Sequence, residues 1–203
     1  MEGSHTSESV ERDSSTPRQR RIARNDSVVI DDSKRLKPNE RKKAAKWIKE
    51  NCLAYGIGEV SVSIINKVGI GIAASMAMRK AIVKILRDYD IRILSGKKKN
   101  SPSILISQYP NIFLLIDAFY VPYVRGFGRR YQKAIVDGDQ KSISIAAASI
   151  IAKVHRDGLM RTLAKKYPTY GWGRNKGYGT RDHQEAIKKN GITKLHRIMF
   201  VET

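Results

Sequence analysis

Two aspartates stand at the ends of apolar stretches and are the first candidates for chemistry. Residues 111–117 read Asn-Ile-Phe-Leu-Leu-Ile-Asp, which is typical of a strand buried on both faces and closed by the carboxylate of Asp117. Asp139 follows a second apolar strand end, after Gly138 has let the backbone turn sharply. Ligands of open α/β sheets bind at the carboxyl ends of strands, so the pair favours a divalent metal site. Each aspartate taken alone is equally typical of an acidic residue facing water.

The element that must hold Asp139 in place is the helix expected after it. Residues 142–152 contain only Ser, Ile and Ala, so the first turns of this helix must pack closely against another element. Ser142 or Ser144 is a candidate N-cap. Asp139 is therefore expected in a polar turn at the rim of a tight core.

The segments around these aspartates resemble bacterial ribonuclease HII. The likeness rests on Leu115-Ile116-Asp117, Gly138-Asp139 with the run from Lys141 to Asp157, Tyr167-Pro168-Thr169-Tyr170-Gly171-Trp172, Asn175-Lys176-Gly177-Tyr178-Gly179-Thr180, His183, His196-Arg197 and Phe200. Upstream, Asp32-Ser33-Lys34-Arg35-Leu36 and Ala54-Tyr55-Gly56-Ile57-Gly58 fit as well. The resemblance runs in order from about Val28 to the end of the chain, and its central motif is long and specific.

The resemblance implies a ribonuclease H-like α/β fold, with a mixed sheet flanked by helices. It implies an endoribonuclease that cuts the RNA strand of RNA/DNA hybrids, and also cuts duplex DNA 5′ to an embedded ribonucleotide. The reaction would be a two-metal-ion hydrolysis of the phosphodiester. Asp117 and Asp139 would be the catalytic and metal-binding residues, and Mg²⁺ or Mn²⁺ would be the cofactor because both are hard cations.

Nucleic-acid contacts are expected from the glycine-rich stretch near the C-terminus. Gly177-Tyr178-Gly179 presents an aromatic ring on a backbone with little side-chain cover, and such a ring can stack on a sugar or base. The resemblance implies that Tyr178 reads the ribonucleotide junction, with further contacts from Lys34, Ser142 and Lys176. Residues 119–130 interleave Arg125, among other arginines, with aromatics, a composition as typical of a surface loop as of a binding segment.

One part of the family pattern is absent from the chain. The family begins with a strand carrying Gly-Ile-Asp-Glu-Ala-Gly-Arg-Gly, whose Asp-Glu pair supplies two of four catalytic carboxylates, and this motif does not occur in the 203 residues. The resemblance therefore implies an N-terminally incomplete member that lacks its first strand or strands, with unpaired sheet edges prone to self-association. The only nearby acids that could replace the pair are Asp26, Asp31 and Asp32. Asp31 and Asp32 are expected in a turn, which is the wrong element for this role. The alternative function is a catalytically impaired or inactive hybrid-binding remnant.

Composition narrows the classes of partner and compartment. The net charge is +20, which favours a polyanionic partner such as nucleic acid, and no apolar run approaches the length of a membrane span. A single cysteine, Cys52, suits a reducing cytoplasm, and no obligate protein partner is indicated. His183 and His196 lie too far from any other Cys or His to form a zinc signature. Residues 1–27 are expected to be a disordered basic and polar tail, and 28–203 the ribonuclease HII-like domain.

Three further elements are predicted upstream of Asp117. Pro38 begins a helix, and residues 70–86 form a long second one. Residues 55–60 alternate in polarity as a strand does. The apolar stripe of the first helix consists of Ala44, Ala45, Trp47, Ile48 and Cys52.

Overall fold

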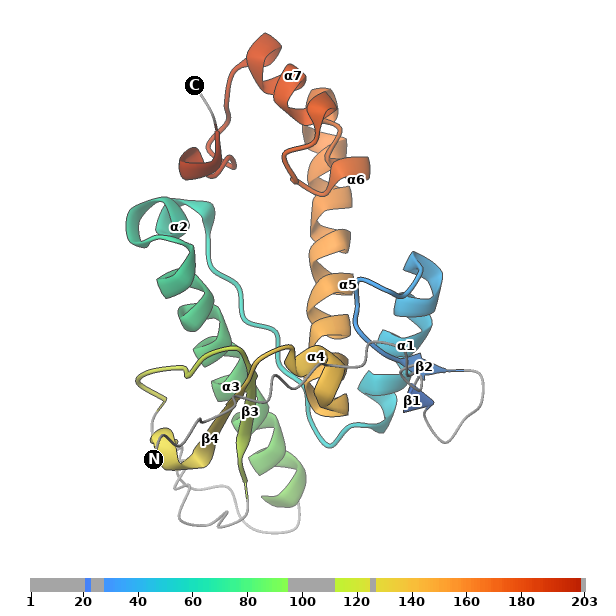
Figure 1. Cartoon of the computed structure of the whole chain (residues 1–203), viewed down its shortest axis with the longest axis vertical. Coiled ribbons are helices and arrows are strands. Elements are labelled where there is room, and N and C mark those ends of the chain that lie inside the picture. Colours follow the sequence, from blue (N-terminus) through green and yellow to red (C-terminus); the bar gives the residue numbers. More distant parts are fainter. Residues whose placement is uncertain (1–20, 23–27, 95–111, 125–126, 202–203) are drawn as a thin grey trace, which may run out of the picture.

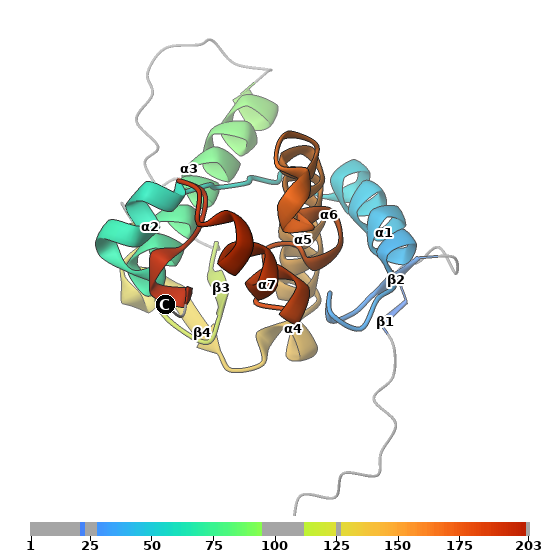
Figure 2. The same cartoon turned by 90° about the horizontal axis from the view of Figure 1, so that it is seen from above.

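A long helix, α5 (Ile143–Lys166), runs through the middle of the molecule, and the other elements are arranged along it (Figure 1). The computed structural model describes residues 21–22, 28–94, 112–124 and 127–201. Helix α1 (Pro38–Asn51) lies on one side of α5, and α3 (Ile70–Leu94) lies on the other side, as the view from above also shows (Figure 2).

The remaining elements are short. They are the antiparallel pair β1 (Arg21–Ile22) and β2 (Val29–Ile30), helix α2 (Val62–Val68), the parallel pair β3 (Leu114–Asp117) and β4 (Gln132–Ile135), and helices α4 (Gly138–Lys141), α6 (Trp172–Asn175) and α7 (Arg181–Asn190). Single 3-10 turns cover Arg129–Tyr131, Pro168–Tyr170 and Ile198–Phe200. The expected α/β class is confirmed, and in the described ranges the strands pair two by two.

The largest core lies where α1 and β2 pack on the first half of α5. Helix α1 begins at Pro38, as predicted, and the side chain of Glu40 accepts a hydrogen bond from the backbone N–H of Lys37 at 2.8 Å. This bond satisfies one of the donors that a helix N-terminus leaves unpaired. The core consists of Val28, Ile30, Leu36, Ala44, Ala45, Ile48, Ala146, Ile150 and Ile151. The small residues early in α5 therefore allow the close helix packing that the sequence predicted.

The parallel pair β3–β4 brings two chain segments to the same edge of a sheet. Leu114 is opposite Gln132, and Asp117 is opposite Ile135, so the ends of the two strands are level. The Gln132 side chain is buried and bonds the backbone N–H and C=O of Val121, each at 3.0 Å. This side chain ties the loop after β3 to the start of β4 and fixes the strand ends that precede the candidate site.

Strand β3 is more open than predicted. The sequence indicated a strand buried on both faces, yet Phe113 is 59% and Leu115 is 41% exposed, and only Ile116 of the strand is buried. The physical reason is that, in the described part of the chain, β3 pairs with β4 alone. A parallel strand normally has neighbours and helices on both faces, and here one face is left partly uncovered.

The prediction of a strand at residues 55–60 is wrong. This segment is extended but pairs with no strand in the described ranges, and it packs on α3 instead. A Cβ atom at Gly58 would overlap the carbonyl oxygen of Ala77, which shows how closely the two backbones approach. Lys80 Nζ donates to the Glu59 carbonyl at 2.9 Å, and Glu59 also contacts His155 of α5. The glycines therefore serve close contact between backbone and helix rather than a sheet.

Several expectations fall outside the described residues. The predicted tail, 1–27, is described only at β1, which pairs with β2. Arg125 and Asp26 also lie outside the described ranges. Among the residues that are described, no helix is both long and apolar enough to cross a membrane.

The packing of the 55–60 segment predicts a difference between two Gly→Ala variants. Gly58→Ala should lower the free energy of unfolding by about 1–3 kcal/mol, because the added methyl meets helix backbone that cannot move aside alone. Gly71→Ala, in the first turn of α3, meets nothing within 4 Å and should be neutral or stabilise by up to about 1 kcal/mol. Urea denaturation measures both, and equal midpoints for the two variants would contradict the packing.

Candidate nucleic-acid and metal site

Asp117 is held at the end of β3 by the start of α4. Its Oδ1 atom accepts a hydrogen bond of 2.8 Å from the backbone N–H of Gly138. A Cβ at residue 138 would lie 2.6 Å from Cδ1 of Ile145 and 3.3 Å from Asp117 Oδ1, so a larger residue would require the end of the Ile145 side chain to shift. The level strand ends and this bond together bring the two predicted segments into contact, as the sequence indicated.

Asp139 lies in the short helix α4 rather than in a turn, which corrects the expectation. The residue before this helix, Asp137, has left-handed backbone angles of φ 54° and ψ 42°, so the chain reverses there and helical structure begins at once. Burial raises the pKa of the Asp139 carboxyl above its usual value, and the charges of Asp32 and Asp117 raise it further, while Lys34 lowers it. Negative charge is therefore concentrated around Asp139, and a cation would relieve it.

The turn after β2 delivers Lys34 to this group. Asp32 is buried, and its Oδ1 accepts a 2.9 Å hydrogen bond from the backbone N–H of Lys34, which closes the turn. The hydroxyl of Ser33 bonds that of Ser149 on α5 at 2.9 Å. Lys34 itself is exposed, and its charge acts on Asp139. The structure therefore brings the predicted Lys34 close enough for its charge to act on Asp139.

Ser142 occupies the N-cap position of α5, but its side chain makes no capping hydrogen bond. Its backbone N–H donates to Gly138 at 2.8 Å and its carbonyl accepts from Ala146 at 2.9 Å, so it joins α4 to α5 through its backbone. The expected capping role of the Ser142 hydroxyl is therefore wrong.

The carboxylates fit part of a site for a hard cation. Carboxylate oxygens are the ligands that Mg²⁺ and Mn²⁺ prefer, and Asp117 and Asp139 are close enough for one charge to shift the pKa of the other. Among the described residues, no three side chains of His, Cys, Asp or Glu gather closely enough to hold a metal ion by themselves. Further oxygen ligands, from water or substrate, would have to complete the set.

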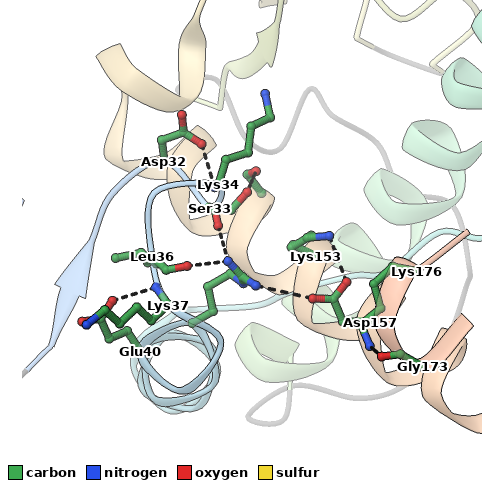
Figure 3. A network of polar contacts seen from close by, with 12 residues as sticks. Asp32, Ser33, Lys34, Leu36, Lys37, Glu40, Lys153, Asp157, Gly173 and Lys176 are labelled. Carbon is green, nitrogen blue, oxygen red and sulfur yellow. Dashed lines mark hydrogen bonds and ion pairs between the residues drawn. The ribbon is translucent and has the colours of Figure 1, made fainter. Parts of the chain in front are cut away.

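A second group of predicted residues lies further along α5. Tyr178 follows two residues with left-handed backbone, Lys176 at φ 53° and Gly177 at φ 77°, and its side chain is 57% exposed. Lys153 Nζ lies 5.3 Å from the centroid of the Tyr178 ring. Burial lowers the pKa of Lys176, whose ammonium contacts the Gly173 carbonyl (Figure 3). An open aromatic ring bordered by lysines is suited to a sugar–phosphate backbone.

A buried carboxylate, Asp157, connects the two groups. Lys153 Nζ lies 2.9 Å from Asp157 Oδ1, and Arg41 of α1 approaches Asp157 Oδ2 at 3.6 Å (Figure 3). Arg41 also donates to the Ser33 carbonyl at 2.8 Å, beside Lys34. A chain of polar contacts therefore runs from the Lys34 turn to the lysine that borders Tyr178.

A cluster of aromatic and histidine rings packs beneath the surface at the Tyr178 loop and supports it. The rings of Tyr170 and Trp172 are stacked, with centroids 5.2 Å apart. His183 and His196 are both buried, and their ring centroids are 5.5 Å apart. The sequence analysis found no role for either histidine. Their spacing along the chain gives no signal, because the fold alone brings them together.

Sequence reasoning also missed Lys153, Asp157 and Arg41. Lys153 and Asp157 are four residues apart on a predicted helix, and this spacing is a signal for an ion pair that could have found them. Arg41 had no comparable signal, because it reaches Asp157 from a different helix.

Comparison with known proteins shows the family of the chain. A family model for ribonuclease HII matches residues 18–203. The chain belongs to the ribonuclease HII family. The chain is 40% identical over 173 residues to the ribonuclease HII of Caldanaerobacter subterraneus subsp. tengcongensis, covering 85% of this chain and 61% of that protein. It is 43% identical to that of Prochlorococcus marinus strain MIT 9215, covering 85% and 72%. It is 38% identical to that of Pelagibacter ubique, covering 86% and 80%.

Metal binding by this chain should depend on Asp117. Asp117→Asn should weaken Mn²⁺ binding by at least about tenfold, since even a residue that only orients a metal ligand commonly contributes that much. Asp137→Asn is the matched control, because Asp137 is exposed, lies two residues from Asp139 and has a backbone conformation that asparagine tolerates. Titration calorimetry measures both, and equal Mn²⁺ affinities would rule out Asp117 as a ligand.

The aromatic and histidine cluster should lose stability in acid. Burial lowers the pKa of His196, and the charge of His183 lowers it further. The unfolded chain then binds more protons, so the stability of the cluster should fall as the pH drops below about 6.5, the usual pKa of histidine, and through the lower folded value. In a Trp47→Phe background, Trp172 fluorescence during urea denaturation reports this region. The same pH dependence in His196→Gln would contradict the assignment.

Proposed function

We propose that this chain acts on nucleic acid as a ribonuclease H of type 2. It would be an endoribonuclease that cuts the RNA strand of RNA/DNA hybrids and cuts duplex DNA 5′ to an embedded ribonucleotide. The proposal is supported by one observation: in this chain of the ribonuclease HII family, Asp117 at the end of β3 accepts a hydrogen bond from the N–H of Gly138, the residue before Asp139, and its charge acts on Asp139. The single cysteine supports a cytoplasmic location, and no obligate protein partner is proposed.

Asp117 and Asp139 would hold Mg²⁺ or Mn²⁺. Divalent cations at such a site activate water and stabilise charge on the phosphate during two-metal-ion hydrolysis. The residues of the chain fix the geometry for this chemistry. The Gly138 N–H holds one Asp117 oxygen, which leaves the other oxygen to face a ligand. Lys34 brings a positive charge to the same place. This charge would offset the repulsion between the carboxylates and an approaching phosphate.

Tyr178 would read the ribonucleotide, and basic residues would hold the backbone around it. Lys153 lies over the ring, and Arg156 donates a 3.2 Å hydrogen bond to the carbonyl of Lys176, two residues before Tyr178. Burial and the nearby Arg156 lower the pKa of Arg197, which shows that basic groups are crowded here. Phosphates would offset this repulsion, and the net charge of +20 favours binding in general.

A second candidate function is hybrid binding with impaired cleavage. One observation favours it: among the described residues no three acidic or histidine side chains gather to hold a metal. The family motif Gly-Ile-Asp-Glu-Ala-Gly-Arg-Gly, with its own two carboxylates, does not occur in the 203 residues. A two-metal site with two protein carboxylates is short of negative charge, so cations would bind weakly.

A cleavage assay separates the two candidates. The purified chain is incubated with Mn²⁺ or Mg²⁺ and a labelled DNA duplex that holds one ribonucleotide, with an all-DNA duplex as control. Cutting 5′ to the ribonucleotide that is lost in Asp139→Asn but kept in Asp137→Asn supports the endoribonuclease. We expect a rate at least about 10³-fold below that of the Prochlorococcus relative, because removing catalytic groups commonly costs that much. Binding without any cutting would support the second candidate.

Binding should be strong at low salt and independent of the carboxylates. If six phosphates are neutralised, affinity for RNA/DNA hybrid should fall about 10³-fold between 50 and 200 mM salt. Asp117→Asn should bind hybrid at least as well as the unmodified chain without metal, since it removes a negative charge. Fluorescence anisotropy measures both. A salt-insensitive affinity, or no binding at 50 mM salt, would count against both candidates.

A further inference from the structure

His183 is a buried histidine on helix α7, one face of which packs on the aromatic cluster. Its side chain is buried, with 6% of its surface exposed, and Ala186 and Ile187 of the same helix are partly buried against Tyr170 and Trp172. An apolar side chain would serve packing at such a position without the cost of burying two ring nitrogens. The partners of those nitrogens therefore indicate why a histidine lies there.

Both ring nitrogens of His183 have partners that fix a single tautomer. The indole Nε1 of Trp172 lies 3.1 Å from Nε2 of His183, and an indole N–H can only donate. Nε2 must therefore accept, which places the proton of the neutral ring on Nδ1. Nδ1 lies 2.9 Å from the carbonyl oxygen of Tyr178, which can only accept. The His183 ring, held in one orientation by buried Trp172, thus fixes the position of the Tyr178 carbonyl.

The backbone of Tyr178 is held while its ring stays open. Its carbonyl also accepts from the N–H of Thr180 at 2.8 Å, and its N–H donates to the Asn175 carbonyl at 2.9 Å. The side chain is nevertheless 57% exposed, with Lys153 Nζ over the ring at 5.3 Å from its centroid. A residue with a fixed backbone and a largely exposed ring is prepared to meet a ligand with little loss of conformational entropy.

We propose that His183 is a positioning residue for recognition of a ribonucleotide: by holding the Tyr178 carbonyl, it orients the Tyr178 ring toward the ribose that carries a 2′-hydroxyl. This inference rests on the proposed function of Tyr178. His183 itself touches no substrate. Its effect should therefore appear in the preference for a ribonucleotide over a deoxyribonucleotide, rather than in general affinity for duplex.

Two amide substitutions separate positioning from packing. In His183→Asn, the amide nitrogen lies where Nδ1 was and can still donate to Tyr178. In His183→Gln, the amide reaches the place of Nε2, so it keeps the Trp172 contact and loses the bond to Tyr178. Both substitutions put a polar amide of comparable size in the same buried place, and each serves as the control for the other.

Two readouts are measured on the full chain. The first is the ratio of affinities for a DNA duplex with one ribonucleotide and for the all-DNA duplex, by anisotropy in EDTA so that nothing is cut. The second is amide hydrogen exchange of residues 177–180 without nucleic acid. We expect His183→Gln to lower the affinity ratio about five- to tenfold, the value of one lost hydrogen bond, and to speed loop exchange. His183→Asn should stay close to the unmodified chain in both.

The possible outcomes distinguish failure of the positioning role of His183 from failure of the proposed function of Tyr178. If His183→Gln matches the unmodified chain in exchange and in affinity ratio, His183 does not position Tyr178. If both variants lose affinity for all-DNA duplex and thermal stability to the same extent, with the ratio unchanged, His183 only packs. If the unmodified chain binds both duplexes equally, or if Tyr178→Ala keeps the affinity ratio of the unmodified chain, Tyr178 confers no preference for a ribonucleotide and its proposed function fails. Faster loop exchange in His183→Gln would then still show that His183 holds the loop.

Discussion

The arrangement of the candidate site depends on the buried carboxylate of Asp157. A carboxylate with 7% exposure is costly unless it is paired. Asp157 has two cationic partners, Lys153 one helical turn earlier on α5 and Arg41 on α1. Arg41 in turn bonds the turn that carries Lys34, so one buried charge fixes helix α1, the Lys34 turn and the lysine beside Tyr178. Removing Asp157 would leave a half-buried arginine and a lysine close together without compensation.

The parts of the site that the sequence predicts are the local ones. Asp117 was predicted because it closes an apolar strand, and Asp139 because it follows the end of a second apolar strand and a glycine that indicated a turn. Residues 55–60 were misassigned because alternating polarity is a strand signal, whereas the close approach of Gly58 to α3 depends on a helix that comes later in the chain. The contact of Arg41 with Asp157 and the burial of His183 likewise depend on the fold, and no local pattern announces them.

The two carboxylates and the Tyr178 loop differ in how they are held. Asp117 and Asp139 depend on a strand pair with an open face, where Leu115 is 41% exposed. The Tyr178 loop rests on a closed cluster that includes Trp172, which is 2% exposed. The nucleic-acid side of the site is therefore built on well-packed core, while the metal side stands on a strand with one face partly uncovered. Binding of hybrid should consequently tolerate conditions that already disturb the carboxylates.

Helix α5 also sets the distance and the relative rotation between the metal side and the nucleic-acid side of the site. Asp139 lies four residues before Ile143, the first residue of α5, and Lys153 follows ten residues after Ile143, about 15 Å along the axis. Each residue of a helix advances by about 1.5 Å and turns by about 100°. One residue inserted between Ile143 and Lys153 would turn Lys153, together with the Tyr178 loop that packs on the later part of α5, away from Asp139 while hardly changing the distance. Seven inserted residues would restore the direction and move the two sides about 10 Å further apart. Length changes in this stretch would therefore act as rotations first, so α5 can vary in sequence more readily than in length.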